Sequence, residues 1–372
     1  MKNRILPLDG LRAIAAFGVI WIHVWAFYAN PSLMISSLNL YKLMAILGNG
    51  VDFFFVISGF CMYLMIDKSF SWKGYKHFLY KRLLRIAPAY FVSILVYASI
   101  IKVFNPSFHF FYNVFFHFLF LNNVVTGNTI SGPFWSLGTE WHFYMILPFF
   151  IWFSNKISLM RSVLLFSFSS IIFMCIINLG YLNYYWWQNQ IFVRFPEFGI
   201  GIIGAYLYLK NWKLPLWLSG IKGLVIGFVI MYSGRTFMVT EFLAKTSGMA
   251  FIFKSIAEPV MCLGFCTMLY NLISQPSIVS RVLSLKPITY LGRISFSVYL
   301  WHSLSILILA HILKSLPYQN YNPIIAFILV SLLTILIAHF SYSLFESLYF
   351  KRPLKIKNNL VKKEATVVNS GF

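Results

Sequence analysis

An arginine and a histidine share one face of the first apolar segment. Arg12 and His23 lie eleven positions apart in LDGLRAIAAFGVIWIHVWAFY. At about 100° per residue, eleven steps bring a helix back to within about 20° of its starting direction, and the rise separates the two side chains by about 16 Å. A guanidinium near one membrane surface would therefore lie below an imidazole near the bilayer centre. Ionisable groups at that depth are costly, which makes both residues candidates for function.

Three further ionisable side chains are expected at similar depths in other apolar segments. Asp52 should lie about nine residues into its helix, about 13 Å deep, and Glu140 about seven residues into another, about 10 Å deep. His302 should lie near the midplane. Buried polar groups often only hold helices together. A histidine and carboxylates in a dry site also suit general-base catalysis, so His23, Asp52 and Glu140 are candidate catalytic residues.

Basic residues precede the third apolar segment. The stretch KSFSWKGYKHFLYKRLLRIAP at 68–88 is rich in Lys and Arg and is expected to form a cytoplasmic loop. The positive-inside rule alone explains most such clusters. Arg82 and Arg85, however, are spaced i, i+3 at the same expected membrane edge as Arg12 and Arg293. A ring of guanidinium groups there suits bidentate binding of phosphates.

A loop rich in aromatic residues indicates a second kind of binding. The segment YLNYYWWQNQ at 181–190 mixes aromatic rings with amides and includes Trp186 and Trp187. Aromatic rings can stack on sugar faces while neighbouring amides hydrogen-bond hydroxyl groups. The same composition is typical of the aromatic belt at the headgroup level of a membrane. Both interpretations stay open.

Composition places these residues in a membrane. Of 372 residues, 59% are hydrophobic and only 10% are charged, whereas soluble domains carry about 25% charged residues. We expect an all-α integral membrane protein with one polytopic domain over 1–350 and a basic cytoplasmic tail over 351–372. The net charge of +21 gathers in short loops between apolar segments. The lipid bilayer is therefore the expected partner, and no nucleic acid is expected.

Ten apolar windows are long enough to be transmembrane helices. They lie near 8–28, 43–66, 86–104, 133–153, 160–180, 191–209, 217–234, 248–273, 289–313 and 322–346. A further apolar stretch at 108–121 is too short to span and predicts one short interfacial or re-entrant helix. Most of the 30 Lys and Arg residues fall on one side of this arrangement, which places both termini in the cytoplasm.

The four cysteines indicate neither a disulfide nor a metal site. Cys61, Cys175, Cys262 and Cys266 all fall inside apolar segments. The i, i+4 spacing of Cys262 and Cys266 is more typical of two small packing residues than of a ligand pair. We therefore expect no zinc or other metal.

Taken in order, these motifs resemble the bacterial membrane acyltransferase 3 family, the acyltransferases of O-antigen, exopolysaccharide, peptidoglycan and related envelope glycans. LDGLRAIAAFGVIWIH is similar to the family's opening Arg-x10-His element, GVDFFFVISGF to its second signature and KRLLRIAPAYF to its Arg-rich third. GPFWSLGTEWHFYMILP is similar to its Trp-Ser-Leu-x-x-Glu element, VRFPEFGIG to its Arg-x-x-Glu-Phe element and SFSVYLWH to its late Tyr-Leu-Trp-His element. The resemblance covers essentially the whole chain. After the fourth element the family commonly has Glu-Glu-Gln, whereas Trp141 and His142 follow Glu140 here, which leaves Glu140 as the sole matching carboxylate.

The resemblance implies an inner-membrane enzyme that transfers an acetyl group from cytoplasmic acetyl-CoA to a hydroxyl of a cell-envelope polysaccharide or lipid-linked glycan. It implies that His23 is the catalytic histidine and that Glu140 is an essential acid near the acceptor. It also implies that Arg12, Arg82 and Arg85 help to hold the CoA phosphates, and we add Arg293 to this cofactor site. The residues expected to contact the acceptor are Trp135, Tyr144, His302, Trp186 and Trp187.

Several alternatives stay open. Intramembrane charges also mark transport paths, so the alternative function is a transporter or flippase of envelope glycan or lipid precursors. A structural subunit of a glycan synthase is a third interpretation. The sequence does not choose between an acyl-His23 intermediate and direct transfer, or between an acetyl and a succinyl donor. Homo-oligomerisation is open as well.

Overall fold

The computed structural model is almost entirely helical within the residues that it describes. Those residues are 4–28, 32–35, 38–44, 48–125, 130–238, 249–312 and 322–347. The longer helices are α1 (Leu6–Phe27), α3 (Gly50–Met65), α4 (Trp72–Phe104), α6 (Trp135–Ile157), α7 (Leu159–Asn178), α9 (Ile191–Leu209), α10 (Gly220–Thr236), α12 (Ala250–Ser274), α15 (Ser295–Ile312) and α16 (Pro323–Ser341). The shorter elements are β1 (Met34–Ile35), β2 (Leu38–Asn39), α2 (Leu40–Met44), α5 (Phe110–Phe118), η2 (Gly132–Phe134), α8 (Tyr184–Trp187), η3 (Leu216–Leu218), α13 (Ile278–Leu283), α14 (Lys286–Arg293) and the π-helical turn η6 (Tyr342–Glu346), with β1 and β2 paired antiparallel. Helices suit such a chain because a segment in lipid must satisfy its own backbone hydrogen bonds.

Seven helices in the described part are long and apolar enough to cross a membrane. They are α1, α4, α7, α9, α12, α15 and α16 extended by η6. The chain is therefore a multi-pass membrane protein. Each of the ten expected windows contains a helix, but α3 has only 16 residues, and α6 and α10 are not among the seven. The count of ten spans and the cytoplasmic position of both ends stay predictions, and the tail over 351–372 lies outside the described residues.

Helix α4 begins earlier than the sequence predicts. A loop is expected before residue 86, but α4 begins at Trp72 and continues for 33 residues. Ser71 caps this helix, because its side chain accepts a hydrogen bond from the backbone N–H of Gly74. The Lys, Arg and Leu residues that follow are good helix formers. Arg82 and Arg85 therefore lie on a helix rather than in a loop.

Two other expected helices are divided. The window at 43–66 is split between α2 and α3, and the window at 289–313 is split at Ile294 between α14 and α15. Asp52 consequently lies in the first turn of α3, so its expected position nine residues into a helix is wrong. A carboxylate is favourable there, because the helix dipole is positive at its N-terminus.

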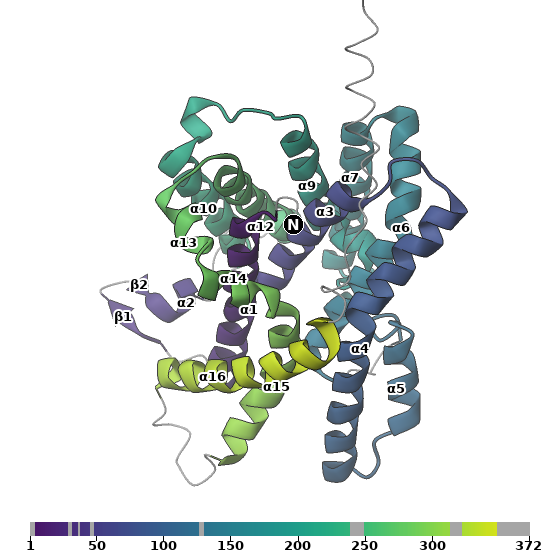
Figure 1. Cartoon of the computed structure of the whole chain (residues 1–372), viewed down its shortest axis with the longest axis vertical. Helices are drawn as coiled ribbons and strands as arrows, with labels where there is room; N and C mark the ends of the chain where they lie inside the picture. The colour runs from purple at the N-terminus through teal and green to yellow at the C-terminus, as the bar shows by residue number, and fades with distance from the viewer. Residues whose placement is uncertain are drawn as a thin grey trace, which may run out of the picture.

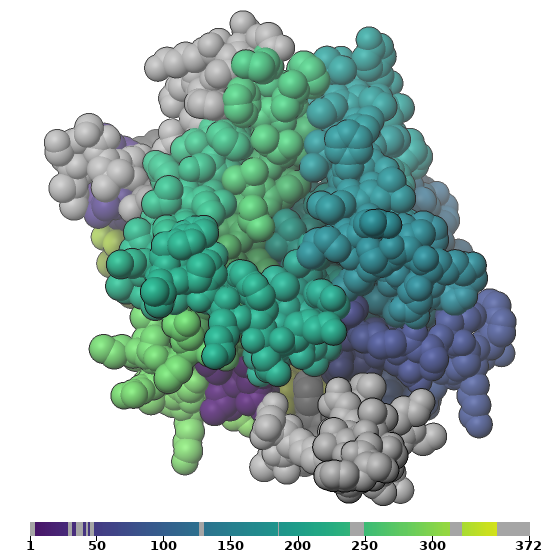
Figure 2. Space-filling model, turned by 90° about the horizontal axis from the view of Figure 1, so that it is seen from above, coloured from purple at the N-terminus to yellow at the C-terminus, as the bar shows by residue number. Residues whose placement is uncertain are grey.

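Helix α1 lies at the centre of the molecule. It packs against α3, α14, α15 and α16, and Figure 1 shows these helices around it. Helix α5, the short helix expected near 108–121, lies beside α4, while α10 and α12 pack together on another side (Figure 1). Seen from above, purple atoms of the start of α1 reach the surface between differently coloured segments (Figure 2). This central position brings the residues of α1 into contact with several helices.

Helices α3 and α9 pack closely because glycines lie between them. A Cβ atom at Gly59 would meet the Phe198 carbonyl oxygen at 2.1 Å, and one at Gly201 would meet the Val56 carbonyl oxygen at 2.0 Å. Both distances are too short for any larger side chain, and small residues commonly allow such close approach in membranes. The glycines thereby set the spacing of the polar residues on these two helices.

Candidate active site

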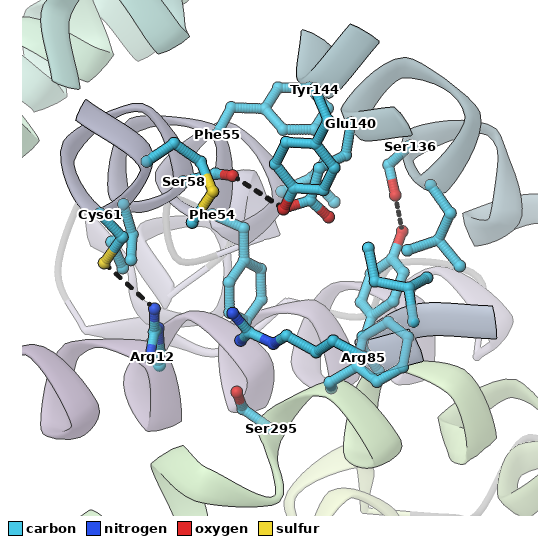
Figure 3. Close-up of a pocket in the computed structure, with 17 residues that line it drawn as sticks. Arg12, Phe54, Phe55, Ser58, Cys61, Arg85, Ser136, Glu140, Tyr144 and Ser295 are labelled. Atoms are coloured by element: carbon cyan, nitrogen blue, oxygen red, sulfur yellow. Dashed lines mark hydrogen bonds between the residues drawn. The ribbon is translucent and has the colours of Figure 1, made fainter. Parts of the chain in front are cut away.

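A cavity lies between α1, α3, α4, α6 and α15. Its polar lining residues are Arg12, Ser58, Cys61, Arg85, Ser136, Glu140, Tyr144, Ser295 and Tyr299. Arg12 and Arg85 lie on one side of it, and Glu140 and Tyr144 lie on the opposite side (Figure 3). The remaining wall is apolar, which strengthens electrostatic interactions inside. The cavity therefore combines a cationic side with an acidic side.

Glu140 is held by two hydroxyl groups. The Ser58 Oγ donates a hydrogen bond to Glu140 Oε1 over 2.8 Å, and the Tyr144 hydroxyl donates to the same oxygen. Ser58 and Tyr144 also lie 3.2 Å apart through their oxygens. Because Tyr144 follows Glu140 by one helical turn, α6 alone brings these two together. Ser58 comes from α3 and completes the group.

Arg12 is oriented by a buried carboxylate on its own helix. Its Nη1 lies 3.5 Å from Asp9 Oδ1, and its Nη2 donates to Cys61 Sγ over 3.3 Å. Asp9 is 2% exposed and also accepts a hydrogen bond from Arg4 Nε over 2.5 Å. The two contacts direct the Arg12 guanidinium toward the cavity. Asp9 is thus a positioning residue for Arg12.

Asp9→Asn is expected to raise the KM for an acyl donor about tenfold and to change kcat less. The ion pair that orients Arg12 is lost, and a tenfold change corresponds to about 1.4 kcal/mol. Steady-state kinetics with acetyl-CoA would measure the two constants. Arg4→Gln is the matched control, because it removes the other partner of Asp9 and should have the smaller effect. An equal effect of both variants would contradict the assignment.

The predicted ring of four arginines is only partly brought together. Arg12 and Arg85 line the cavity. Arg82 is buried beside α3, with its Nη2 3.8 Å from Met65 Sδ, and is not a lining residue. Arg293 is exposed, with its guanidinium 5.4 Å from the centre of the Tyr290 ring. Two of the four guanidinium groups therefore face a common space.

His23 is paired with His302. Their ring centres lie 5.0 Å apart, and the ring of His302 lies 5.7 Å from that of Tyr299, which lines the cavity. The Nδ1–H of His23 donates to the Val19 carbonyl over 2.8 Å, and the Nδ1–H of His302 donates to the Tyr299 carbonyl over 2.6 Å. A carbonyl can only accept, so the proton of each neutral ring is on Nδ1. This leaves the Nε2 lone pair of His23 available as a base or nucleophile.

The four ionisable residues expected at one depth do not form a single group. His23 is half-buried and does not line the cavity, and within the described residues it forms no hydrogen bond with Glu140 or Asp52. Tyr299 lines the cavity and contacts His302, and His302 in turn contacts His23. Sequence reasoning had no means of finding this, because it requires the relative rotation of α1 and α15.

Asp52 belongs to a separate ion-pair network. Nη1 of Arg194 lies 3.4 Å from Asp52, 3.3 Å from Glu197 and 3.5 Å from Glu258. Trp135 lies against this network, with its ring centre 5.4 Å from the Arg194 guanidinium, and is not a lining residue of the cavity. Arg194 and Glu197 lie in the VRFPEFGIG motif, but the sequence interpretation assigned neither of them a role. Glu258, on α12, was not singled out.

Trp186 and Trp187 lie away from the cavity. The Trp186 Nε1 donates to the Val124 carbonyl over 2.6 Å, and Trp187 packs against Phe173 and Phe192. Both are parts of α8, a short helix within the segment expected to be a loop. Their contacts are those of packed residues at a helix end.

Five polar lining residues escaped the sequence interpretation. They are Ser58, Cys61, Ser136, Ser295 and Tyr299. Ser136 and Tyr299 join α6 to α15 through hydroxyl groups 2.7 Å apart. Small hydroxyl and thiol side chains within apolar segments give no signal of their own, because they occur as often in packing contacts.

The family comparison covers almost the whole chain. A family described as an acyltransferase domain matches residues 5–342. The chain belongs to this acyltransferase 3 family. The resemblance predicted from the six motifs is therefore confirmed.

Relatives of this family member are distant but extend over most of the chain. ORF330 of Acidianus two-tailed virus is 26% identical over 82% of this chain and 84% of its own length. O-acetyltransferase OatA of Staphylococcus aureus strain MRSA252 is 26% identical over 97% of this chain and 60% of its own length. Peptidoglycan O-acetyltransferase OatA of Listeria monocytogenes is 25% identical over 81% of this chain and 49% of its own length. The chain thus spans about half to three fifths of the OatA proteins. No solved structure matches it.

Proposed function

We propose that this protein is a multi-pass O-acyltransferase that transfers an acetyl group from cytoplasmic acetyl-CoA to a hydroxyl of a cell-envelope glycan. Family membership and the names of the two OatA relatives support the reaction class. The observation that carries the proposal is the cavity with Arg12 and Arg85 facing Glu140 and Tyr144. We place the enzyme in the bacterial inner membrane.

The cationic side of the cavity is the proposed site for the donor's phosphates. A guanidinium group can donate two parallel hydrogen bonds to the oxygens of one phosphate. An apolar wall strengthens this attraction. Arg12 and Arg85 are the proposed contacts to the phosphates. Arg82 is proposed to act indirectly, by packing α4 against α3 next to Arg85. With the phosphates there, the pantetheine arm extends along α1 toward His23, about 16 Å away along the helix axis.

His23 is the proposed catalytic base or nucleophile. As a base, its Nε2 takes the proton of the sugar hydroxyl while that oxygen attacks the thioester carbonyl, and the leaving CoA thiolate then receives the proton. As a nucleophile, Nε2 attacks the thioester carbonyl, the C–S bond breaks and the CoA thiolate leaves, which gives an acyl-imidazole. The sugar hydroxyl then attacks that acyl carbon, the N–C bond breaks to return His23, and the hydroxyl proton passes to the CoA thiolate. Rapid quenching that traps an acetylated protein would identify the second route.

The acidic side of the cavity is proposed to hold part of the acceptor, whose reacting hydroxyl extends past Tyr299 and His302 to His23. Glu140 offers a carboxylate oxygen, and Ser58 and Tyr144 offer hydroxyl lone pairs, as acceptors for the proton of a sugar hydroxyl group. His302, whose ring packs against that of His23, is proposed to contact the acceptor where it approaches His23. Trp135, Trp186 and Trp187 lie outside the cavity. They are proposed to contact parts of the glycan that are distant from the reacting hydroxyl.

The direct test compares the surface glycans of cells with and without this protein by mass spectrometry. A gain of one acetyl group per modified sugar is expected, and one succinyl group would identify the other donor. Purified protein in lipid nanodiscs should release CoA from acetyl-CoA only when the glycan is present. Glycan translocation that needs no CoA would instead support a flippase.

Arg85→Gln is expected to raise the KM for acetyl-CoA at least about tenfold, because a charged contact to phosphate is lost. Arg293→Gln is the matched control, since this exposed residue lies outside the cavity. Its KM should stay within about twofold of wild type. Initial rates at varied acetyl-CoA concentration measure both. A larger effect at Arg293 would place the donor's phosphates outside the cavity.

A further inference from the structure

A second, smaller cavity lies between α7, α9 and α12. Its polar lining residues are Ser170, Arg194, Glu197, Ser255 and Glu258, and the rest of its wall is apolar. It has room for about one water-sized particle. It is separate from the Arg12–Glu140 cavity and shares no lining residue with it.

One carboxylate oxygen at this cavity has no partner in the described part of the chain. Glu197 is 2% exposed and its Oε1 lies 3.3 Å from Arg194, but its Oε2 forms no hydrogen bond with any described residue. A buried carboxylate oxygen that lacks a partner is unfavourable by several kcal/mol or more. Because Glu197 lines the cavity, a donor or a cation located there would satisfy this oxygen.

The two serines of the cavity present lone pairs rather than protons. The Ser170 hydroxyl donates to the Phe192 carbonyl over 2.5 Å, and the Ser255 hydroxyl donates to the Phe251 carbonyl over 2.6 Å. Ser255 also accepts a hydrogen bond from Asn178 Nδ2. Since each hydroxyl has one proton, both oxygens face a ligand only as acceptors. The cavity thus offers oxygen acceptors from three elements.

One guanidinium group is the ion-pair partner of all three buried carboxylates around Glu197. Arg194 is shared among Asp52, Glu197 and Glu258. Arg235 on α10 acts electrostatically on Asp52 and Glu258, and Lys254 on α12 acts on Glu258. Glu197 lies 3.3 Å from Arg194 through Oε1, while its Oε2 is left without a hydrogen-bond partner among the described residues.

We propose that this cavity binds one monovalent cation of the size of Na⁺, through Glu197, Glu258 and the hydroxyl oxygens of Ser170 and Ser255. Carboxylate and hydroxyl oxygens are hard ligands, the kind that hard cations prefer. The small volume excludes a hydrated ion or a larger amine. Bound there, the cation ties α7 to α9 and α12 and stabilises the end of α9 that holds Arg194 against Asp52.

The test is the thermal midpoint Tm of the full chain in lipid nanodiscs, at fixed pH and ionic strength. NaCl is exchanged for N-methyl-D-glucamine chloride, whose cation cannot enter. A saturable rise of about 3 °C in Tm with NaCl is expected, because a ligand that binds only the folded state stabilises it. Glu197→Gln should abolish this rise, and Ser255→Ala should shift it to higher NaCl concentration.

Glu346→Gln is the matched control. Glu346 is equally buried, but Ser297 donates to it and it lies outside this cavity, so its variant should keep the full NaCl response. Equal Tm values in the two salts would overturn the proposal, as would a full response in Glu197→Gln. If Glu197→Gln does not fold, the wild-type titration and Ser255→Ala decide. A Tm that follows pH but not NaCl would show a proton on Glu197 instead of a cation. None of these outcomes depends on acyl transfer.

Discussion

Replacing His23 with alanine should lower acetyl transfer at least about 100-fold, because general-base or nucleophilic groups contribute about 10²–10⁴-fold. The Nε2 of this residue carries the lone pair, since the Val19 carbonyl holds the ring proton on Nδ1, and Nε2 forms no hydrogen bond with any described residue. The folded protein should persist, because that hydrogen bond lies within α1 and His23 is only half-buried. Transfer of labelled acetyl from acetyl-CoA to glycan, in proteoliposomes, measures the loss.

His311→Ala is the control for this variant. His311 also lies on a membrane-spanning helix, in the last turn of α15, but its side chain is exposed. Its variant should retain near-normal transfer. If His23→Ala retained near-normal transfer as well, His23 would have no catalytic role. Loss of the folded protein, measured by size-exclusion chromatography, would make His23 a packing residue.

Glu140→Gln should reduce acetyl transfer about 100-fold or more while the donor still binds. The amide keeps the size of the side chain but removes the negative charge opposite Arg12 and Arg85. Ser58 and Tyr144 would then lose a charged acceptor, and hydrogen bonds to charged groups contribute about 1.5–3 kcal/mol each. Transfer rate and acetyl-CoA binding, measured on one preparation, separate catalysis from donor affinity.

Two further variants test whether the loss of transfer depends on the Glu140 carboxylate itself. Tyr144→Phe removes one hydroxyl donor but keeps the carboxylate, and should give an intermediate loss of transfer. Asp67→Asn removes a carboxylate from the exposed turn before α4, where Asp67 accepts hydrogen bonds from the backbone N–H and hydroxyl of Ser69. This variant should leave transfer unchanged. Near-normal transfer in Glu140→Gln would remove this residue from the reaction.

Local sequence patterns predict much of the fold. Apolar length located a helix in each of ten windows, and the window at 191–209 matches α9 at both ends. Boundaries were less accurate where capping and tertiary contacts decide them. Ser71 caps α4, which therefore begins well before its apolar part. Ile294 divides an apolar segment for which composition alone predicts one continuous helix.

The sequence by itself determined the membrane class, the family and the shared face of Arg12 and His23, because composition, motif order and helical period are local properties. Only the tertiary structure decided which side chains meet across helices. It placed Glu140 with Ser58 and Tyr144, Asp52 with Arg194, and His23 with His302. The reason is physical: helix rotation and spacing depend on close packing between distant segments, such as the glycine contacts of α3 and α9, and no single segment encodes them.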